Sequence, residues 1–136
     1  MADTIRRVDS YSLEVADEPG EAYRVLSWLE EAGVKLVYFT AYPVGGGKAK
    51  LDLVVEDAEA LADATRARGL PSLARTPAFM VSGRDGVGRA AEILRHLADA
   101  RINVHAATGT VQSGNYGIIL WVQPSDVEAA MRALRL

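Results

Sequence analysis

The sequence predicts an α+β protein built from two tandem copies of one strand–helix–strand–strand–helix–strand unit, with antiparallel sheets and the helices on one face. The first observation behind this prediction is the stretch 79–110, which has the pattern of a strand, a glycine-rich turn, a helix and a second strand. The second is that the same pattern occurs earlier, shifted by 68 positions, half of the 136-residue chain. Similarity at a fixed offset predicts two copies of one structural unit.

The helix expected over residues 89–101 is amphipathic. Its apolar residues recur at spacings of three and four, so one face should pack on the sheet: Ala90, Ile93, Leu94 and Leu97. Asp85 is expected to cap this helix, because a carboxylate at the N-cap accepts hydrogen bonds from first-turn N–H groups. Gly86 and Gly88 leave neighbouring amides uncovered, so that a small anionic group can reach them.

Matching residues mark the repeat across both halves. At an offset of 68 they include Asp17 and Asp85, Gly20 and Gly88, Ala22 and Ala90, Leu26 and Leu94, Leu29 and Leu97, Ala32 and Ala100, Thr40 and Thr108, and Gly46 and Gly114. The repeat therefore predicts two domains, residues 1–76 and 77–136, with the join near residues 69–76.

The first copy is expected to be complete. Alternating apolar residues predict a strand over 10–16, and further strands are expected over 34–42, 48–55 and 70–75. The first helix should start at Asp17, with Pro19 in its first turn and Gly33 as a left-handed cap at its end. A second helix is expected over 57–68, closed by Gly69. The segment Gly45-Gly46-Gly47-Lys48 lacks the full pattern of a phosphate-binding loop and is interpreted as a hairpin turn.

The second copy is expected to lack its last strand. Its expected elements are strands over 79–82, 102–110 and 116–123 and helices over 89–101 and 125–135, which leaves a sheet edge at 78–82 unpaired. We expect either a homodimer or pairing of this edge with residues 4–9. The run 118–122 is apolar at every position, which predicts that both faces of that strand are covered.

Taken together, residues 10–136 resemble the ACT domain, an amino-acid-sensing module of ferredoxin-like fold (βαββαβ). The resemblance rests on Asp17-Glu18-Pro19-Gly20 with Trp28-Leu29-Glu30-Glu31-Ala32-Gly33-Val34, and on Asp85-Gly86-Val87-Gly88 with Leu97-Ala98-Asp99-Ala100-Arg101-Ile102-Asn103-Val104. It implies two tandem ACT-type repeats and a role in allosteric regulation.

The resemblance also implies a ligand site. In the family, ligands bind between the glycine turn and the start of the second strand, often across a domain interface, which implies Asp85, Gly86, Val87, Gly88 and Asn103 in the second repeat. The matching positions of the first repeat, Asp17, Gly20 and Lys35, form the weaker candidate. Lys35 replaces the amide of Asn103 with a cation, which cannot accept a hydrogen bond from a ligand ammonium group.

Composition excludes several classes of function. The chain has no cysteine, which excludes disulfides, thiolate nucleophiles and cysteine-based zinc sites. A net charge of −3 with interspersed signs predicts neither nucleic-acid nor membrane binding. The charged N-terminus lacks the apolar region of a secretory signal, so a cytoplasmic protein is expected. His96 and His105 lack the carboxylate spacing of a metal site or a catalytic triad. No catalytic residue, cofactor or metal is predicted.

We therefore expect a non-catalytic sensor or a regulatory subunit of a metabolic enzyme, with a small amino acid as ligand. The alternative is an assembly module without a ligand. A third hypothesis is RNA binding, because Gly114-Asn115-Tyr116-Gly117-Ile118-Ile119-Leu120-Trp121 imitates the central-strand motif of RNA-recognition modules. The acidic net charge and the lack of a basic first position in this motif argue against it.

Overall fold

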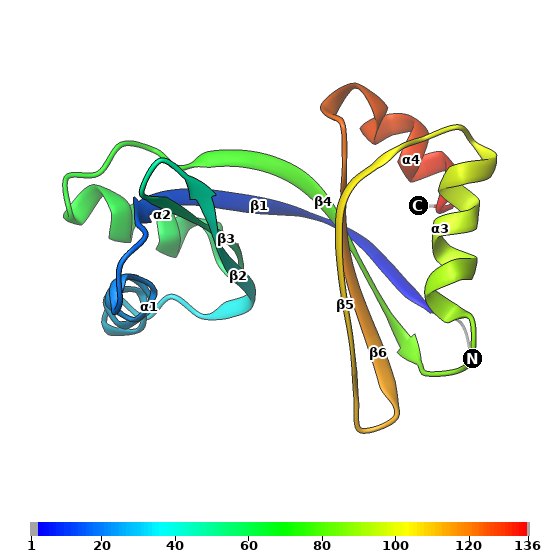
Figure 1. Ribbon diagram of the computed structural model, residues 1–136, viewed down its shortest axis with the longest axis horizontal. Helices are drawn as coiled ribbons and strands as arrows, with labels where there is room; N and C mark the ends of the chain where they lie inside the picture. Colours follow the sequence, from blue (N-terminus) through cyan, green and yellow to red (C-terminus); the bar gives the residue numbers. More distant parts are fainter. Residues whose placement is uncertain (1–2, 136) are drawn as a thin grey trace. The chain divides into compact units, whose positions relative to one another are not determined.

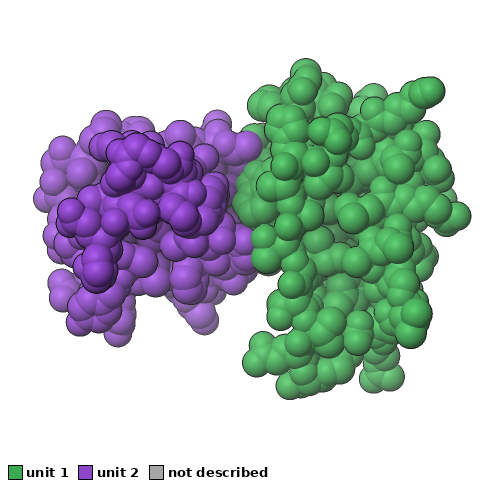
Figure 2. All heavy atoms as spheres, viewed as in Figure 1, with its two compact units in different colours: residues 1–9, 77–136 green, residues 10–76 purple. Residues whose placement is uncertain are grey.

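The computed structural model describes residues 3–135, which form two compact units. One unit is Ser10–Thr76, and the other combines Met1–Asp9 with Pro77–Leu136 (Figure 2). The expected boundaries, 1–76 and 77–136, differ from this division at the N-terminus, because the described residues 3–9 group with 77–135.

The chain alternates strands and helices as an α+β fold (Figure 1). The elements are β1 (Thr4–Ala16), α1 (Glu21–Glu31), β2 (Leu36–Gly45), β3 (Lys48–Val55), α2 (Ala58–Ala67), β4 (Ala74–Arg84), α3 (Arg89–Asp99), β5 (Val104–Gln112), β6 (Asn115–Val122), the 3₁₀ turn η1 (Pro124–Asp126) and α4 (Val127–Ala133). The strand order is β2-β3-β1-β4-β6-β5, and β1 with β3, β2 with β3, β4 with β6 and β5 with β6 pair antiparallel. The predicted fold class, ferredoxin-like with antiparallel strands, is confirmed.

Two long strands each serve both units. Residues 10–16 of β1 and 74–76 of β4 belong to one unit, whereas residues 4–9 of β1 and 77–84 of β4 belong to the other. The strands expected separately over 70–75 and 79–82 are thus one continuous strand. Because β1 lies beside β4 in the sheet, residues 4–9 supply the fourth strand that the second half lacks. Ile5 of this segment packs against the core of that unit.

Each unit has a core between its helices and one face of its sheet. In the unit 10–76 the most buried members are Leu29, Leu51, Leu53, Val25 and Leu61. In the other unit they are Phe79, Leu97, Leu120, Ala130, Val81 and Val122. The prediction that both faces of the apolar run in β6 are covered is confirmed, since Leu120 is fully buried on one face and Ile119 is 2% exposed on the other.

A β-bulge changes the register of the repeat. Helices α1 and α3 start 68 residues apart, but β3 and β6 start 67 apart. The pairing of β2 with β3 shifts between Pro43 and Gly45, which adds one residue to β2. The Asp17 amide donates to the Gly47 carbonyl at 2.9 Å and the Asp85 amide to the Gly114 carbonyl at 3.0 Å. Gly47, rather than the expected Gly46, is therefore the counterpart of Gly114.

The ends of the helices agree with the sequence in part. Gly33 and Gly69 are left-handed, with φ of 76° and 70°, as predicted. Arg101 stands at the position that matches Gly33 and is also left-handed, with φ of 60°. The helix expected over 125–135 is shorter, because its start forms the 3₁₀ turn η1 at Pro124.

Candidate functional site

The two glycine turns lead into α1 and α3 without a side-chain cap. The N-caps are Gly20 and Gly88, with φ of 89° and 84°, and no side chain accepts a hydrogen bond from the first turn of either helix. The expectation that Asp85 caps α3 is therefore wrong. By contrast, the Asp57 carboxylate caps α2 by accepting from the amides of Glu59 at 3.0 Å and Ala60 at 3.3 Å.

The first repeat shows the same departure from the sequence prediction. Asp17 lies three residues before the N-cap Gly20 and does not start α1. Pro19 also precedes the N-cap, so it removes no N–H group from the helix itself. The left-handed glycine is the physical reason in both turns, because it reverses the chain just before the helix and leaves the preceding aspartate outside the cap position.

The turn before α3 is open to solvent. Asp85, Gly86, Val87 and Gly88 are all exposed, and the Val87 side chain is exposed as fully as in an extended chain, at 110%. The Asp85 carboxylate makes no hydrogen bond or ion pair with another residue in the described range 3–135. An uncapped helix start with positive electrostatic potential is a place where a carboxylate can accept backbone hydrogen bonds.

The structure does not bring Asn103 to this turn within one unit. Asp85–Gly88 precede α3 and Asn103 follows it, so the helix separates them (Figure 1). Its 11 residues span about 16 Å at the rise of an α-helix. In the same way, α1 separates Asp17 and Gly20 from Lys35. A single amino acid cannot touch both segments of one unit.

Lys35 borders a shallow hollow where α1 leads into β2. The hollow has a volume of about 350 Å³ and is lined by Leu26, Glu30, Gly33, Val34, Lys35 and Leu36. The Lys35 ammonium lies 3.7 Å from the Glu56 carboxylate, and both side chains are more than half exposed. Sequence reasoning named Lys35 but missed the hollow. The apolar residues Leu26 and Leu36, one on each side of the turn, could have indicated it.

A polar cluster on the face of the sheet opposite the helices was also missed. Ser12 Oγ donates to the Asp52 carboxylate at 2.6 Å, the Tyr42 hydroxyl donates to it at 2.8 Å, and Lys50 Nζ lies 4.0 Å from it. Burial, with the Asp52 carboxylate as the next cause, raises the pKa of Tyr42 to about 12. Alternation along β3 places Lys50 and Asp52 on one face and could have indicated this cluster.

The remaining motifs do not form a chemical site. His96 is half-buried on α3 and His105 is exposed on β5, and within residues 3–135 no three acidic, histidine or cysteine side chains are placed to hold a metal ion. Tyr116, one of the two aromatic residues of the RNA-like motif, is 5% exposed and belongs to the core, so it cannot stack on a base. Burial, followed by the Asp3 carboxylate, raises its pKa to about 12. No helix within the described range is long and apolar enough to cross a membrane.

Comparison with known proteins places the fold but no family. No protein-family model matches the sequence, and no curated protein matches it. Among solved structures, the protein BT0572 from Bacteroides thetaiotaomicron matches with a TM-score of 0.81 and 14% identity, over 96% of this chain and 88% of that one. The ligand-free regulatory subunit of aspartate kinase from Thermus thermophilus matches with a TM-score of 0.65 and 16% identity, over 98% and 94% of the two chains. A structure of aspartokinase alpha and beta subunits matches with a TM-score of 0.61 and 21% identity, over 99% and 95%. These likenesses show an ACT-like fold.

Proposed function

We propose that this chain is a non-catalytic regulatory protein that binds a small amino acid or a related metabolite. The observation that carries the proposal is the exposed, uncapped turn Asp85–Gly88 at the start of α3. Its backbone amides suit a ligand carboxylate, and the unpaired Asp85 carboxylate suits a ligand ammonium group. The likeness to a regulatory subunit of aspartate kinase supports a role as the regulatory partner of a metabolic enzyme.

The position of Asn103 makes the proposed site a composite one. Since α3 separates Asn103 from the turn Asp85–Gly88, the amide that completes the site must come from a second copy of the chain. A twofold dimer provides this arrangement twice, because each chain then offers its turn to the Asn103 of the other. We propose a homodimer for this reason.

The second repeat is the preferred site in this proposal. The Asn103 amide both donates and accepts hydrogen bonds, whereas Lys35 only donates and carries a charge that repels the ammonium group of an amino acid. The Lys35–Glu56 ion pair is exposed and weak, so it does not neutralise this repulsion. We therefore expect one amino acid per chain.

Calorimetry with each of the twenty amino acids tests the proposal. A ligand at 100 times its dissociation constant should stabilise the folded chain by about 2.7 kcal/mol, which a thermal-shift measurement also detects. Asn103→Ala should weaken binding by about tenfold or more, because it removes a hydrogen bond to a charged group. Lys35→Ala is the matched control and should leave affinity unchanged. A stoichiometry of two per chain, or the reverse ranking of these variants, would contradict the assignment.

Mixing two variants tests the composite site directly. Asp85→Ala, which removes the turn carboxylate, and Asn103→Ala should each leave the sites largely empty at a ligand concentration close to the wild-type dissociation constant. After the two variants are unfolded and refolded together, half of the dimers should be mixed, and each mixed dimer regains one intact site. Binding should therefore return to about one quarter of the wild-type stoichiometry. No recovery in a sample with a dimeric mass would show that the turn and Asn103 do not act together.

A further inference from the structure

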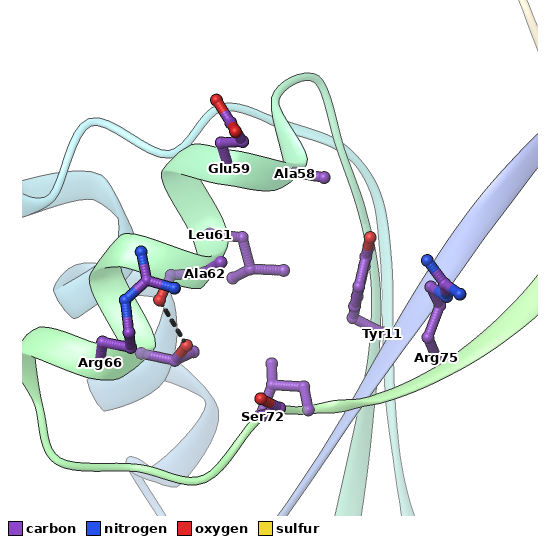
Figure 3. A pocket seen from close by; sticks show the side chains of 10 residues that line it. Tyr11, Ala58, Glu59, Leu61, Ala62, Arg66, Ser72 and Arg75 are labelled. Carbon is purple, nitrogen blue, oxygen red and sulfur yellow. Dashed lines mark hydrogen bonds between the residues drawn. The ribbon is translucent and has the colours of Figure 1, made fainter.

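A pocket in the unit 10–76 lies away from both glycine turns. It has a volume of about 410 Å³ and lies between α2 and the strands β1 and β4. Tyr11 and Leu61 face one another across it, with Ser72 at one end and Ala58 at the other (Figure 3). This volume is at the lower end of the range for small-molecule sites, so it suits a ligand no larger than a short-chain metabolite.

Small side chains on α2 leave this space open. Leu61 is buried in the core, and two of the other α2 residues that line the pocket are alanines, Ala58 and Ala62. On the opposite side, Leu73, just before β4, and Arg75, within β4, both line the pocket. The wall is therefore mainly apolar and comes from a helix and a sheet that the core already holds in place.

Polar groups without partners gather at the rim of the pocket. The Tyr11 hydroxyl, the Ser72 hydroxyl and the Arg75 guanidinium make no hydrogen bond or ion pair with any residue that the structure describes. Arg75 and Tyr11 both line the pocket, and the Glu59 carboxylate points away from it on the outer side of α2 (Figure 3).

Arg75 supplies a positive charge at this rim. The Arg66 guanidinium is paired with Asp63, whereas Arg75 and Glu59 have no ion-pair partner within residues 3–135, and the Glu59 carboxylate lies on the outer side of α2 (Figure 3). A guanidinium binds a carboxylate with two parallel hydrogen bonds, and the hydroxyls of Tyr11 and Ser72 donate further bonds.

We infer that this pocket binds a small carboxylate with an apolar tail. The carboxylate pairs with Arg75 and accepts from the Tyr11 hydroxyl, and the tail lies between Leu61, Ala62 and the Tyr11 ring. This site differs from the one under Proposed function in both location and chemistry, since it recognises an acid without requiring an ammonium group.

Titration with 4-methylpentanoate, followed by backbone amide NMR shifts and calorimetry, tests the inference. We expect shifts confined to the pocket residues, Tyr11, 58–66 and 72–75. The neutral isostere 4-methylpentanamide should bind at least tenfold more weakly, and acetate, which lacks the tail, should also bind at least tenfold more weakly. Equal affinity for the acid and the amide would overturn the role of Arg75, and absence of shifts at tens of millimolar would overturn the site.

Three variants of the full chain make the test specific. Arg75→Gln should weaken 4-methylpentanoate binding by at least tenfold, whereas Lys48→Gln, which removes the same charge from an exposed position of the same unit, should change it less than twofold. Ala62→Leu should abolish binding by filling the pocket, without lowering the melting temperature. Asn103→Ala should leave this binding intact, which separates its outcome from that of the proposed amino-acid site. Loss of binding in Lys48→Gln or in Asn103→Ala would contradict the inference.

Discussion

Arg101 is held in a backbone conformation that favours glycine, and its replacement by glycine should stabilise the protein. Arg101 ends α3 with φ of 60°, and Gly33 ends α1 at the matching position with φ of 76°. Both ends carry the same hydrogen bond, Val34 to Leu29 in one and Ile102 to Leu97 in the other, each at 2.9 Å. The Arg101 side chain is exposed and makes no hydrogen bond or ion pair within residues 3–135, so its removal loses no contact of that kind.

The expected gain follows from two opposing terms. A left-handed conformation costs a residue with a Cβ atom about 1–2 kcal/mol, which Arg101→Gly removes. Glycine adds about 0.4–1 kcal/mol of conformational freedom to the unfolded chain, which opposes the gain. The net stabilisation is about 0.5–1 kcal/mol. Gly33→Ala should destabilise by a similar amount, because no atom lies within 4 Å of an added Cβ and the backbone conformation alone is penalised.

Denaturant titration and thermal melting measure both changes. With an unfolding entropy of about 2.1 cal/mol/K per residue, 1 kcal/mol corresponds to about 3–4 °C in this 136-residue chain if it melts in one transition. Arg101→Ala is the control, because it removes the same side chain and keeps the Cβ atom. If Arg101→Gly is no more stable than Arg101→Ala, the backbone conformation at this position is not the cause.

Further predictions concern the shared strand, alkaline pH and the helix cap. Ile5→Ala should destabilise the unit that contains residues 77–136 by about 1–2 kcal/mol, because Ile5 is half-buried against the core of that unit. Thr4→Ala, at an exposed position, is the control and should change stability by less than about 0.5 kcal/mol. Equal effects of the two variants in urea titrations would contradict this prediction. The pKa values of Tyr42 and Tyr116 are both raised to about 12, so the folded state favours their protonated forms. Their contribution to the free energy of unfolding is therefore fully present below about pH 10 and is lost as the pH rises toward 12. Tyr116→Phe should therefore reduce the fall in stability measured between pH 10 and 12, and an unchanged fall would refute this. Asp57→Ala should cost about 1 kcal/mol by removing the cap of α2, while Asp85→Ala, which caps nothing, should leave stability nearly unchanged in the same melting experiment.

Local patterns in the sequence predicted most of the fold because they act over a few residues. The apolar stripe of α3 and the left-handed Gly33 are both local properties of a helix and its end. Ile93, Leu94 and Leu97 of the stripe pack in the core, whereas Ala90 is exposed, and Gly33 is left-handed as predicted. The bulge in β2 was not predictable from spacing alone, since Pro43-Val44-Gly45-Gly46-Gly47 fits either a longer turn or an extra strand residue. The partner strand decides between these, because the pairing of Gly45 with Lys48 extends β2 to the turn.

The candidate site was predicted less completely because its parts are far apart in space. The family motif includes both Asp85 and Asn103, but the two residues lie at opposite ends of α3. Their spacing in the sequence does not reveal this separation. The missing side-chain caps have a similar origin. Asp85 lies three residues before the N-cap Gly88, and it could cap α3 only if the residues between them were helical. Gly88 is left-handed instead, which leaves Asp85 outside the helix.

The strands β1 and β4 explain why the repeat in the sequence and the units in the structure differ at the N-terminus. A ferredoxin-like unit needs a fourth strand beside its first, and the second half of the chain ends its described part just after α4 without one. The same sheet position can be filled by any segment with the right alternation, and residues 4–9 directly precede the first strand of the other unit. Extending β1 toward the N-terminus fills this position without a new loop, because β1 and β4 are neighbours in the sheet. Repetition in the sequence thus indicates which residues occupy matching positions, whereas strand pairing decides which residues share a core.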